Sequence, residues 1–338
     1  MIPVNKEQNK TMLAIFDDMS SIIGESQKVL VVSHIDPDGD AIGTQLAFAD
    51  YLRFQKKDVY LVKESDLPEK YKFLPDVDLI KNIEDYDQDL GIDTVIILEC
   101  PEFNRLGKAY TLFGDKVRII NIDHHRDSSM LGDVNWIEPM RSSVGEMIFE
   151  YFEASGFNIN KDIATQLYTA ILTDTGRFRY NATSPRTMEI VGKLIAAGAD
   201  PKYICDEVYY NLSQSTMMLT AKVLHSIEYH CSGRICLLTL TKKMLEDSGA
   251  DMSESDGLVD FTLFTEGVVV GALIKESDRN ATKISMRSRD GINVAEIAAK
   301  FSGGGHFNAA GCTIGENLGN AKKVILEHLK EELNDPSC

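Results

Sequence analysis

The sequence of 338 residues lacks two features that would place it outside the cytoplasm. No segment approaches the roughly 20 apolar residues of a membrane helix, and the N-terminal MIPVNKEQNK has no signal-peptide pattern. We therefore expect a cytoplasmic protein without a membrane partner. The six cysteines are scattered and form no C-x-x-C pair, which argues against a zinc ribbon or a disulfide framework. We expect them to be free thiols that pack as small apolar residues.

The chain also has little positive charge, with 35 Lys and Arg against 52 Asp and Glu and a formal net charge of −17. Proteins that bind long nucleic acid usually have a row of Lys and Arg on their surface, because counterion release drives that binding. No such run of basic residues occurs, so we expect no long duplex as a partner. A small anionic substrate remains compatible with this charge, and bound cations would neutralise part of the acidity.

The first half of the chain alternates apolar strands with helical patterns. This alternation predicts an α/β fold whose mostly parallel sheet is flanked by helices. The predicted strands are residues 28–34, 59–62, 94–98 and 117–122, and the predicted helices are residues 41–54, 143–153, 162–172 and 185–197.

The character of the sequence changes near residues 198–200, and the length suits two domains. We predict a catalytic domain over residues 1–200, a helical linker over 201–229 and a smaller C-terminal α+β domain over 230–338. The last domain would contain a mixed sheet, with strands at residues 234–241, 267–274 and 283–289. We expect the active site in the cleft between the two domains.

The strongest local signal is the acidic segment HIDPDGD at residues 34–40, which directly follows an apolar strand. Ligands of open α/β sheets bind at such strand ends. Asp36, Asp38 and Asp40 would repel one another unless a cation lay among them. An EF-hand loop is excluded, because Ala41 stands where glycine is needed and Ala47 where the last carboxylate is needed. Histidine together with carboxylates suits a first-row divalent metal ion.

Other acidic and histidine residues follow the remaining predicted elements. In a parallel sheet these strand ends lie at the same edge as the segment 34–40, so the pattern predicts a two-metal centre. The residues concerned are Glu99 after strand 94–98, Asp123, His124 and His125 after strand 117–122, and Asp174 at the end of helix 162–172.

The second half offers groups that bind phosphate. Ser285, Arg287 and Arg289 alternate along a predicted strand and therefore share one face. Residues 303–306 read GGGH and predict a glycine-rich turn. A triple glycine alone is more often a flexible turn. Next to arginines, its backbone N–H groups can bind phosphate.

Taken together, these motifs resemble the DHH phosphoesterases that carry a C-terminal DHH-associated domain. Within that family the chain is most similar to the group of oligoribonucleases (nanoRNases) that are also 3'-phosphoadenosine-5'-phosphate phosphatases. The resemblance covers nearly the whole chain. Its motifs, in order, are HIDPDGDAIG, NRLG, DHH, RSSVGE, TDTGRFRY and GGGHFNAAG.

The resemblance implies a role for each motif residue. Two Mn²⁺ ions are expected, with Mg²⁺ or Co²⁺ as substitutes. One ion would be held by His34, Asp38 and Glu99, and the other by Asp40, Glu99, His124 and Asp174. Asp123 would orient ligands, His125 would lie near the substrate phosphate, and Asp36 would support the site. The implied substrate-binding residues are Ser285, Arg287, Arg289, Gly304, Gly305 and His306.

Glu99 departs from the family, whose members usually have aspartate at this position. Glutamate keeps the carboxylate and adds a methylene group, so it can still bridge two ions. It could also weaken one site or alter the metal preference. Glu102, three residues further along, is an alternative ligand.

The resemblance implies hydrolysis of short oligoribonucleotides to mononucleotides, and of 3'-phosphoadenosine 5'-phosphate to AMP. Two alternatives stay open: a phosphodiesterase for cyclic dinucleotides or pApA, and a non-catalytic nucleotide-binding relative inactivated at Glu99. The sequence does not identify the group that protonates the leaving oxygen, for which His125 is a candidate. The apolar helices of residues 203–224 leave a homodimer open.

Overall fold

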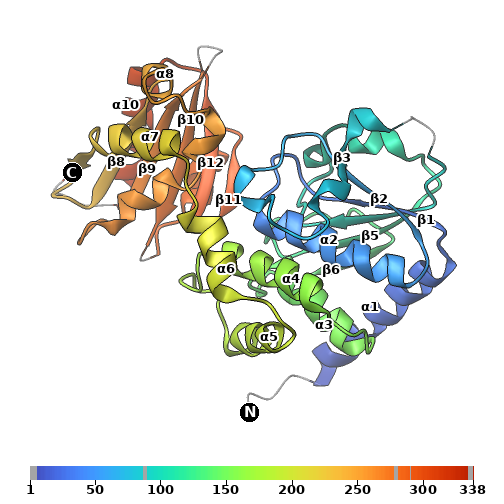
Figure 1. The fold of residues 1–338 in the computed structure, drawn as a ribbon. Helices are drawn as coiled ribbons and strands as arrows, with labels where there is room; N and C mark the ends of the chain where they lie inside the picture. Colours follow the sequence, from blue (N-terminus) through green and yellow to red (C-terminus); the bar gives the residue numbers. More distant parts are fainter. Residues whose placement is uncertain (1–5, 87–89, 278–280, 290, 334–337) are drawn as a thin grey trace. The chain divides into compact units, whose positions relative to one another are not determined.

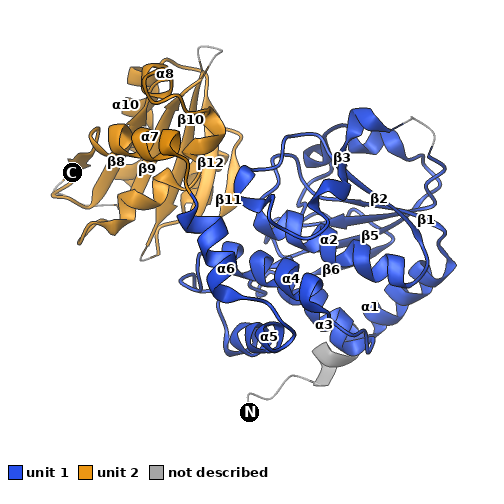
Figure 2. Ribbon diagram, viewed as in Figure 1, with its two compact units in different colours: residues 1–211 blue, residues 212–338 orange. Residues whose placement is uncertain are grey.

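A computed structural model describes residues 6–86, 90–277, 281–289, 291–333 and 338 of the chain (Figure 1). These form two compact units, Met1–Asn211 and Leu212–Cys338 (Figure 2). The boundary falls inside the predicted linker 201–229, and the exact three-part division of the chain stays a prediction. In the part that the structure describes, no helix is long and apolar enough to cross a membrane.

Unit 1 is built on a six-stranded sheet in the order β3-β2-β1-β4-β5-β6. Every pair of neighbouring strands is parallel, which confirms the predicted α/β fold. The strands are β1 (Lys28–Val32), β2 (Asp58–Lys63), β3 (Ile80–Asn82), β4 (Thr94–Leu98), β5 (Arg118–Asp123) and β6 (Val134–Ile137). The short edge strands β3 and β6 were not predicted, because neither has a long apolar run.

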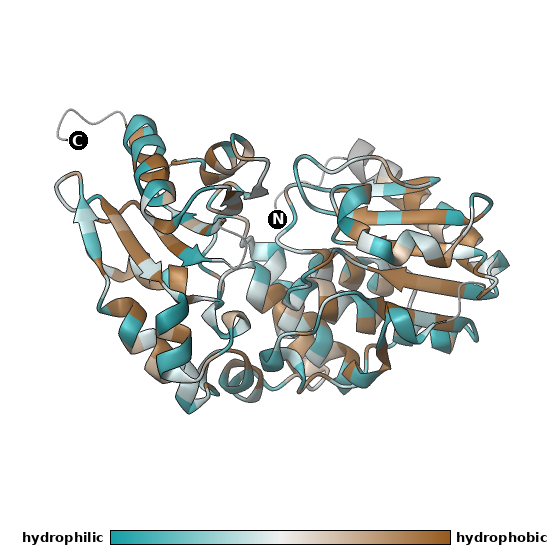
Figure 3. Ribbon diagram, turned by 90° about the horizontal axis from the view of Figure 1, so that it is seen from above, coloured by the Kyte–Doolittle hydropathy of each residue, from teal (hydrophilic) through white to brown (hydrophobic). Residues whose placement is uncertain are grey.

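Both faces of this sheet are buried. Side chains of alternate strand residues, such as Val31 and Ile96, belong to a core that also contains residues of five α-helices, whereas Leu30 and Ile97 face the opposite way and share a core with the 3-10 segment Phe103–Leu112. The central strands are accordingly hydrophobic along their length (Figure 3). The five helices are α1 (Lys6–Glu25), α2 (Gly39–Phe54), α3 (Val144–Ala154), α4 (Lys161–Asp174) and α5 (Pro185–Ala196).

Short helical segments complete unit 1. They comprise the 3-10 turns Glu69–Tyr71, Val77–Leu79 and Ile83–Asp85, helix α6 (Pro201–Cys205) and the π-helical turn Asp206–Tyr210. The helix α1 was not predicted, and it packs on the sheet through residues such as Phe16 and Met19.

Three helices of unit 1 approach one another closely through glycine. A Cβ atom built at Gly43 of α2 would lie 2.4 Å from the backbone oxygen of Gln166 in α4. One built at Gly145 of α3 would lie 2.7 Å from Cβ of Ala170, also in α4. These glycines therefore set how near the helices α2 and α3 lie to α4.

We expect Gly43→Ala to destabilise the protein by about 1–3 kcal/mol, because the added methyl group must push two helices apart. Thermal unfolding should show a fall in Tm of several degrees. Gly192→Ala is the matched control, since Gly192 lies exposed in α5 with no atom within 4 Å of the added Cβ. It should raise the stability by up to about 1 kcal/mol. Equal effects of the two substitutions would contradict the packing argument.

Unit 2 contains a second six-stranded sheet, in the order β11-β12-β10-β9-β8-β7. Strands β8 and β9 are parallel and the other pairs antiparallel, so the predicted mixed sheet is confirmed. The strands are β7 (Glu228–His230), β8 (Ile235–Leu240), β9 (Val270–Glu276), β10 (Thr282–Ser288), β11 (Gly304–His306) and β12 (Ala309–Ile314). The helical elements are α7 (Gln214–Leu224), α8 (Lys242–Ser248), α9 (Val294–Ala299), α10 (Leu318–Leu333) and the 3-10 turns Met252–Ser255 and Leu258–Phe264.

Three expectations for unit 2 were wrong. The helix predicted up to residue 229 ends at Leu224, and Glu228 begins the strand β7, which pairs with β8. The predicted glycine turn is the strand β11, because pairing with β12 outweighs the low strand propensity of glycine. Cys231 and Cys338 form a disulfide, with Cα atoms 4.5 Å apart, which spacing in the sequence cannot reveal. The other four cysteines are free, as expected.

Candidate metal centre

The acidic and histidine residues of unit 1 gather where the strand order of its sheet reverses. The chain runs outward from β1 through β2 to β3 on one side, and from β4 through β5 to β6 on the other. A parallel sheet has its ligand site at the carboxyl ends of such neighbouring strands. His34 follows β1, Glu99 follows β4, and His124 follows β5, so all three lie at this edge.

A first group of ligand atoms comes from His34, Asp38 and Glu99, and these atoms lie within 4.8 Å of one another. His34 Nε2 is 2.6 Å from Glu99 Oε2. The backbone directs both side chains. Asp38 is the N-cap of α2, and Glu99 has φ = 54°, a left-handed conformation that is uncommon for glutamate.

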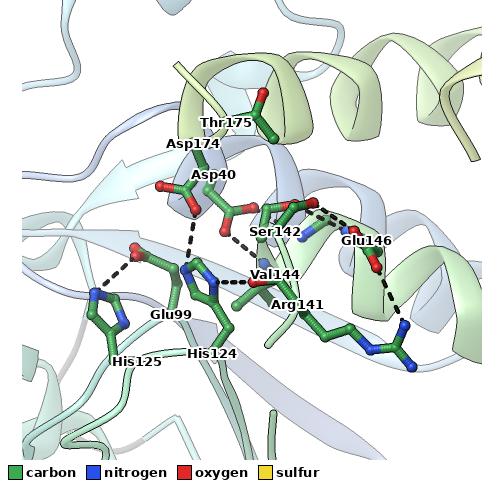
Figure 4. A network of polar contacts seen from close by, with 12 residues as sticks. Asp40, Glu99, His124, His125, Arg141, Ser142, Val144, Glu146, Asp174 and Thr175 are labelled. Atoms are coloured by element: carbon green, nitrogen blue, oxygen red, sulfur yellow. Dashed lines mark hydrogen bonds and ion pairs between the residues drawn. The ribbon is translucent and has the colours of Figure 1, made fainter. Parts of the chain in front are cut away.

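A second group comes from Asp40, His124 and Asp174. His124 Nε2 lies 3.2 Å from Asp174 Oδ2, and Figure 4 shows the imidazole ring between that carboxylate and the backbone of Arg141. The resemblance also implies Glu99 as a ligand of this ion. In the structure, Glu99 instead shares a third group with His124 and His125, and its Oε1 is 3.6 Å from His125 Nε2.

Asp40 is fully buried and held by the first turn of α3. Its Oδ2 accepts a hydrogen bond from the backbone N–H of Val144 at 2.7 Å, and its Oδ1 from that of Gly145 at 2.9 Å. A carboxylate is favoured at a helix N-terminus, where backbone N–H groups are unpaired. A Cβ at Gly145 would lie 3.4 Å from Asp40 Oδ1, an ordinary van der Waals contact, so the backbone N–H groups rather than the lack of a side chain hold this carboxylate.

Asp123 is a buried anchor for the segment that contains both histidines. Its Oδ1 accepts hydrogen bonds from the backbone N–H groups of His124 and His125, at 2.8 and 3.2 Å, and from His125 Nδ1 at 2.7 Å. Burial alone would raise the pKa of Asp123. The hydrogen bond and the charge of His125 outweigh it and lower that pKa to about 2.

Burial and mutual repulsion raise the pKa values of the other carboxyl groups. Burial raises the pKa of Asp40 to about 8, with a further contribution from the charge of Asp174. It raises the pKa of Asp174 to about 7 and that of Glu99 well above its usual range. Burial opposes the charge of His124, but the carboxylates of Asp174, Asp40 and Glu99 raise its pKa to about 9. The centre therefore favours added positive charge, from protons or from a cation.

These residues fit a divalent metal ion. Glu99 is 1% exposed and its Oε2 accepts no hydrogen bond from the described residues, despite its closeness to His34. Side chains that bind one metal ion are expected to lie close together in this way without forming hydrogen bonds to each other. The donor set of imidazole nitrogen and carboxylate oxygen suits Mn²⁺, Zn²⁺ or a similar ion.

Two of the predicted candidates lie outside these groups. Asp36 has φ = 55° and an exposed side chain, and it belongs to none of the three groups of described residues. Glu102 is also exposed and belongs to none of them.

The predicted phosphate-binding residues lie in unit 2, on and beside adjacent strands. The register aligns Arg287 of β10, Ala309 of β12 and His306 of β11 in one row. Ser285, Gly311 and Gly304 form the next row on the same face. Residues directly opposite one another share a face of an antiparallel pair, so the side chains of Arg287 and His306 lie on one face.

Both arginines have partners within unit 2. Arg287 Nε donates to Asp260 Oδ1 at 3.0 Å, and the Arg289 guanidinium, just beyond the end of β10, donates to the carbonyl of Leu263. Gly305 has φ = 138°, and a Cβ there would lie 2.5 Å from the carbonyl oxygen of Ala309, so only glycine fits.

Several residues that support the centre were not assigned roles from the sequence. The carbonyl of Arg105 accepts from the N–H of Ile35 at 2.8 Å, next to His34. The carbonyl of Arg141 lies 3.1 Å from His124 Nδ1, and the N–H groups of Val144 and Gly145 hold Asp40. The motifs NRLG and RSSVGE contain these residues. Because the contacts use backbone atoms, residue type alone could not reveal them.

Known proteins with similar sequences match the chain along most of its length. The model described as "DHH family, N-terminal domain" matches residues 28–171, and that described as "DHHA1 domain" matches residues 234–335. The bifunctional oligoribonuclease and PAP phosphatase NrnA of Thermus thermophilus is 32% identical over 311 residues, which are 90% of each chain.

Two further proteins are similar to this chain over nearly its whole length. The cyclic-di-AMP phosphodiesterase PdeA of Listeria monocytogenes is 26% identical over 96% of this chain, which spans 50% of that relative. The crystal structure of an exopolyphosphatase-related protein from Bacteroides fragilis superposes with a TM-score of 0.88 and 28% identity. It covers 94% of this chain and 96% of that one.

Proposed function

Since the chain belongs to the DHH family of metal-dependent phosphoesterases, we propose that it hydrolyses short oligoribonucleotides to mononucleotides and 3'-phosphoadenosine 5'-phosphate to AMP. The observation that carries this proposal is the edge of the unit 1 sheet, where carboxylates and histidines, most of them buried, form groups that share Glu99 and His124. The T. thermophilus relative, a bifunctional oligoribonuclease and PAP phosphatase that is 32% identical over 90% of this chain, supports the substrate class.

We propose two Mn²⁺ ions as cofactors, with Mg²⁺ or Co²⁺ as substitutes. His34, Asp38 and Glu99 would hold one ion, and Asp40, His124 and Asp174 the other, with Glu99 between them. When bound, such a pair supplies an activated water and stabilises negative charge at phosphorus.

The remaining residues of the centre would orient groups and move protons. Asp123 fixes the ring of His125 through the 2.7 Å hydrogen bond to Nδ1. That hydrogen bond, with the charges of Glu99 and Asp123, outweighs burial and raises the pKa of His125. A histidine that keeps its proton suits a general acid for the leaving oxygen. Asp36 would support the segment 34–40 from its exposed side.

Unit 2 would bind the substrate. Ser285 and Arg287 on β10, Arg289 beside it, and Gly304, Gly305 and His306 on β11 offer guanidinium, imidazole, hydroxyl and backbone N–H donors. These are the groups that bind phosphate. The pairing of Arg287 with Asp260 would hold the guanidinium in one orientation before a nucleotide arrives.

A second candidate is a phosphodiesterase for cyclic dinucleotides or for pApA. The L. monocytogenes relative, a cyclic-di-AMP phosphodiesterase, favours the cyclic dinucleotides. This chain covers only 50% of that relative.

A substrate panel separates the two functions. With saturating Mn²⁺, we expect mononucleotides from pApA and from a five-nucleotide RNA, and AMP from 3'-phosphoadenosine 5'-phosphate. Hydrolysis of cyclic di-AMP with little action on the five-nucleotide RNA would favour the second candidate. If folded protein that binds Mn²⁺ hydrolyses none of these substrates, the result would favour a non-catalytic nucleotide-binding protein.

Proton release on metal binding gives a pH test of the centre. The pKa of Asp40, 3.8 in an unfolded chain, is raised to about 8, and that of Asp174 to about 7. Between about pH 4 and 8 the metal-free folded protein binds more protons than the unfolded chain, so its stability falls as pH rises. Metal ions compete with these protons, and with the proton of His124, so metal affinity rises over the same range.

We therefore expect the gain in Tm from a fixed Mn²⁺ concentration to be larger at pH 8.5 than at pH 6. Differential scanning fluorimetry with Mn²⁺ and with EDTA at each pH measures this gain. A gain that does not change with pH would contradict the assignment of these buried carboxyl groups as ligands.

A further inference from the structure

One short segment contacts two of the candidate ligands of the second ion. Residues 141–145 precede and begin α3. The carbonyl of Arg141 lies 3.1 Å from His124 Nδ1, while the N–H groups of Val144 and Gly145 donate to Asp40. Any shift of this segment would therefore move the imidazole and one carboxylate of the Asp40, His124 and Asp174 group together (Figure 4).

The contact at Arg141 decides which nitrogen of His124 can bind metal. A carbonyl oxygen only accepts, so Nδ1 must hold the proton and donate it to Arg141. In the neutral ring Nε2 is then the nitrogen that carries the lone pair, and it lies 3.2 Å from Asp174 Oδ2. A hydrogen bond of this kind fixes the tautomer and the ring orientation of a ligating histidine.

Arg141 itself lies in no helix or strand, so its carbonyl needs another restraint. Its guanidinium provides one, because Nη1 lies 3.3 Å from Glu146 Oε1 and Nη2 lies 2.8 Å from Glu150 Oε2. Glu146 and Glu150 are one turn apart on α3, so one face of the helix holds both Nη atoms of the Arg141 guanidinium.

Glu146 is the more deeply buried of the two, at 2% exposure. Its Oε2 accepts hydrogen bonds from Ser142 Oγ at 2.5 Å and from Thr187 Oγ1 of α5 at 2.7 Å. Burying a carboxylate is costly, and an apolar side chain at such a position is often as stable. The arrangement therefore points to a requirement for orientation beyond packing.

We propose that Glu146 is a positioning residue for the metal ion of the Asp40, His124 and Asp174 group. By holding Arg141 and Ser142, it fixes the carbonyl that orients His124, and with it the start of the helix that holds Asp40. This inference rests on the proposed function, in which that group holds one of two catalytic ions.

The test is direct Mn²⁺ binding to the whole protein, counted by electron paramagnetic resonance of free Mn²⁺. Glu146→Gln keeps the size of the side chain and removes its charge. We expect the Kd of one of the two ions to rise about 10–100-fold, the size of effect known for residues behind metal ligands. The other ion should bind as before. At saturating Mn²⁺, kcat should return to within a few-fold of the original protein, with KM for nucleotide unchanged.

Glu153→Gln is the matched control on the same helix. Glu153 is exposed and pairs with Arg186 and Lys193 of α5, without contact to Arg141. It should leave both Mn²⁺ affinities unchanged. If Glu146→Gln does not fold, as judged by circular dichroism, Arg141→Met removes the guanidinium, keeps the carbonyl and should weaken the same ion.

Two outcomes would overturn the proposal: unchanged Mn²⁺ affinities in a folded Glu146→Gln or Arg141→Met protein, or an equal loss in Glu153→Gln. A fall in Tm without a change in Kd would assign Glu146 a structural role only and reject the proposal. The binding measurement needs no substrate. If the original protein binds two Mn²⁺ ions but hydrolyses no phosphoester, the proposed function fails while the positioning role stands.

Discussion

Glu99→Gln should lower the rate of phosphoester hydrolysis by about three orders of magnitude at saturating substrate. Glu99 supplies ligand atoms to two groups, and its carboxylate lies between His34 and His125. Glutamine keeps the shape but replaces one oxygen with an NH₂ group that cannot bind a metal ion. Metal ions contribute several kcal/mol to stabilising charge in the transition state, and each ~1.4 kcal/mol is a factor of ten.

Two further variants make this result specific. Glu99→Asp keeps the charge and tolerates the left-handed backbone at φ = 54°, so its loss of activity should be intermediate. Glu102→Gln changes an exposed carboxylate outside the metal-binding groups and should leave the rate within about two-fold. If Glu102→Gln were as damaging as Glu99→Gln, Glu102 would replace Glu99 as the ligand.

Asp174→Asn should lower the rate of hydrolysis about as much as Glu99→Gln does. It should not lower the stability of the metal-free protein at pH 8. Burial raises the pKa of Asp174 to about 7, so at pH 8 its ionised form is less favourable in the folded than in the unfolded chain. Asparagine removes that cost together with a ligand. Thermal unfolding in EDTA should give a Tm equal to or above that of the original protein, while initial rates with Mn²⁺ fall about 1,000-fold.

Asp162→Asn, at the other end of the same helix, should have the opposite effects: a slightly lower stability and an unchanged rate of hydrolysis. Asp162 is exposed in the first turn of α4, where a negative charge favours the helix. Its loss should cost a few tenths of a kcal/mol and leave the hydrolysis rate unchanged. A metal-free Asp174→Asn protein that unfolds well below the original protein would show that Asp174 mainly stabilises the fold.

The candidate ligands could be predicted from the sequence because each combines a charged or imidazole side chain with a position after a predicted element. Glu99 and His124 follow strands with apolar runs, and the parallel arrangement brings these ends to one edge. The prediction needed only residue types and the topology of α/β sheets.

The support for those ligands could not be predicted in the same way. Asp40 is held by the backbone N–H groups of Val144 and Gly145, and every residue except proline has such a group. The tight approach of α2 to α4 depends on Gly43, yet glycine in a helical pattern indicates only a weakened helix. Such contacts become visible only when the three-dimensional packing is known.

Predictions from local propensity were also wrong for short elements whose conformation depends on pairing with a neighbouring strand. Gly304–His306 reads as a turn, but β12 supplies its hydrogen-bond partners and makes it an edge strand. The three residues of β7 follow directly from a helical pattern and are strand only through β8. Short elements of this kind depend on neighbours far along the chain.

The parallel sheet of unit 1 has a consequence for folding kinetics. Val29 of β1 pairs with Thr94 of β4, 65 positions later in the sequence, and the candidate ligands in unit 1 span His34 to Asp174. Long loops must close before these groups meet, so the ion site can form only after the slow, non-local strand pairing. Mn²⁺ should therefore leave the refolding rate of the chain nearly unchanged and lower its unfolding rate. The bound ions would then stabilise the folded protein kinetically.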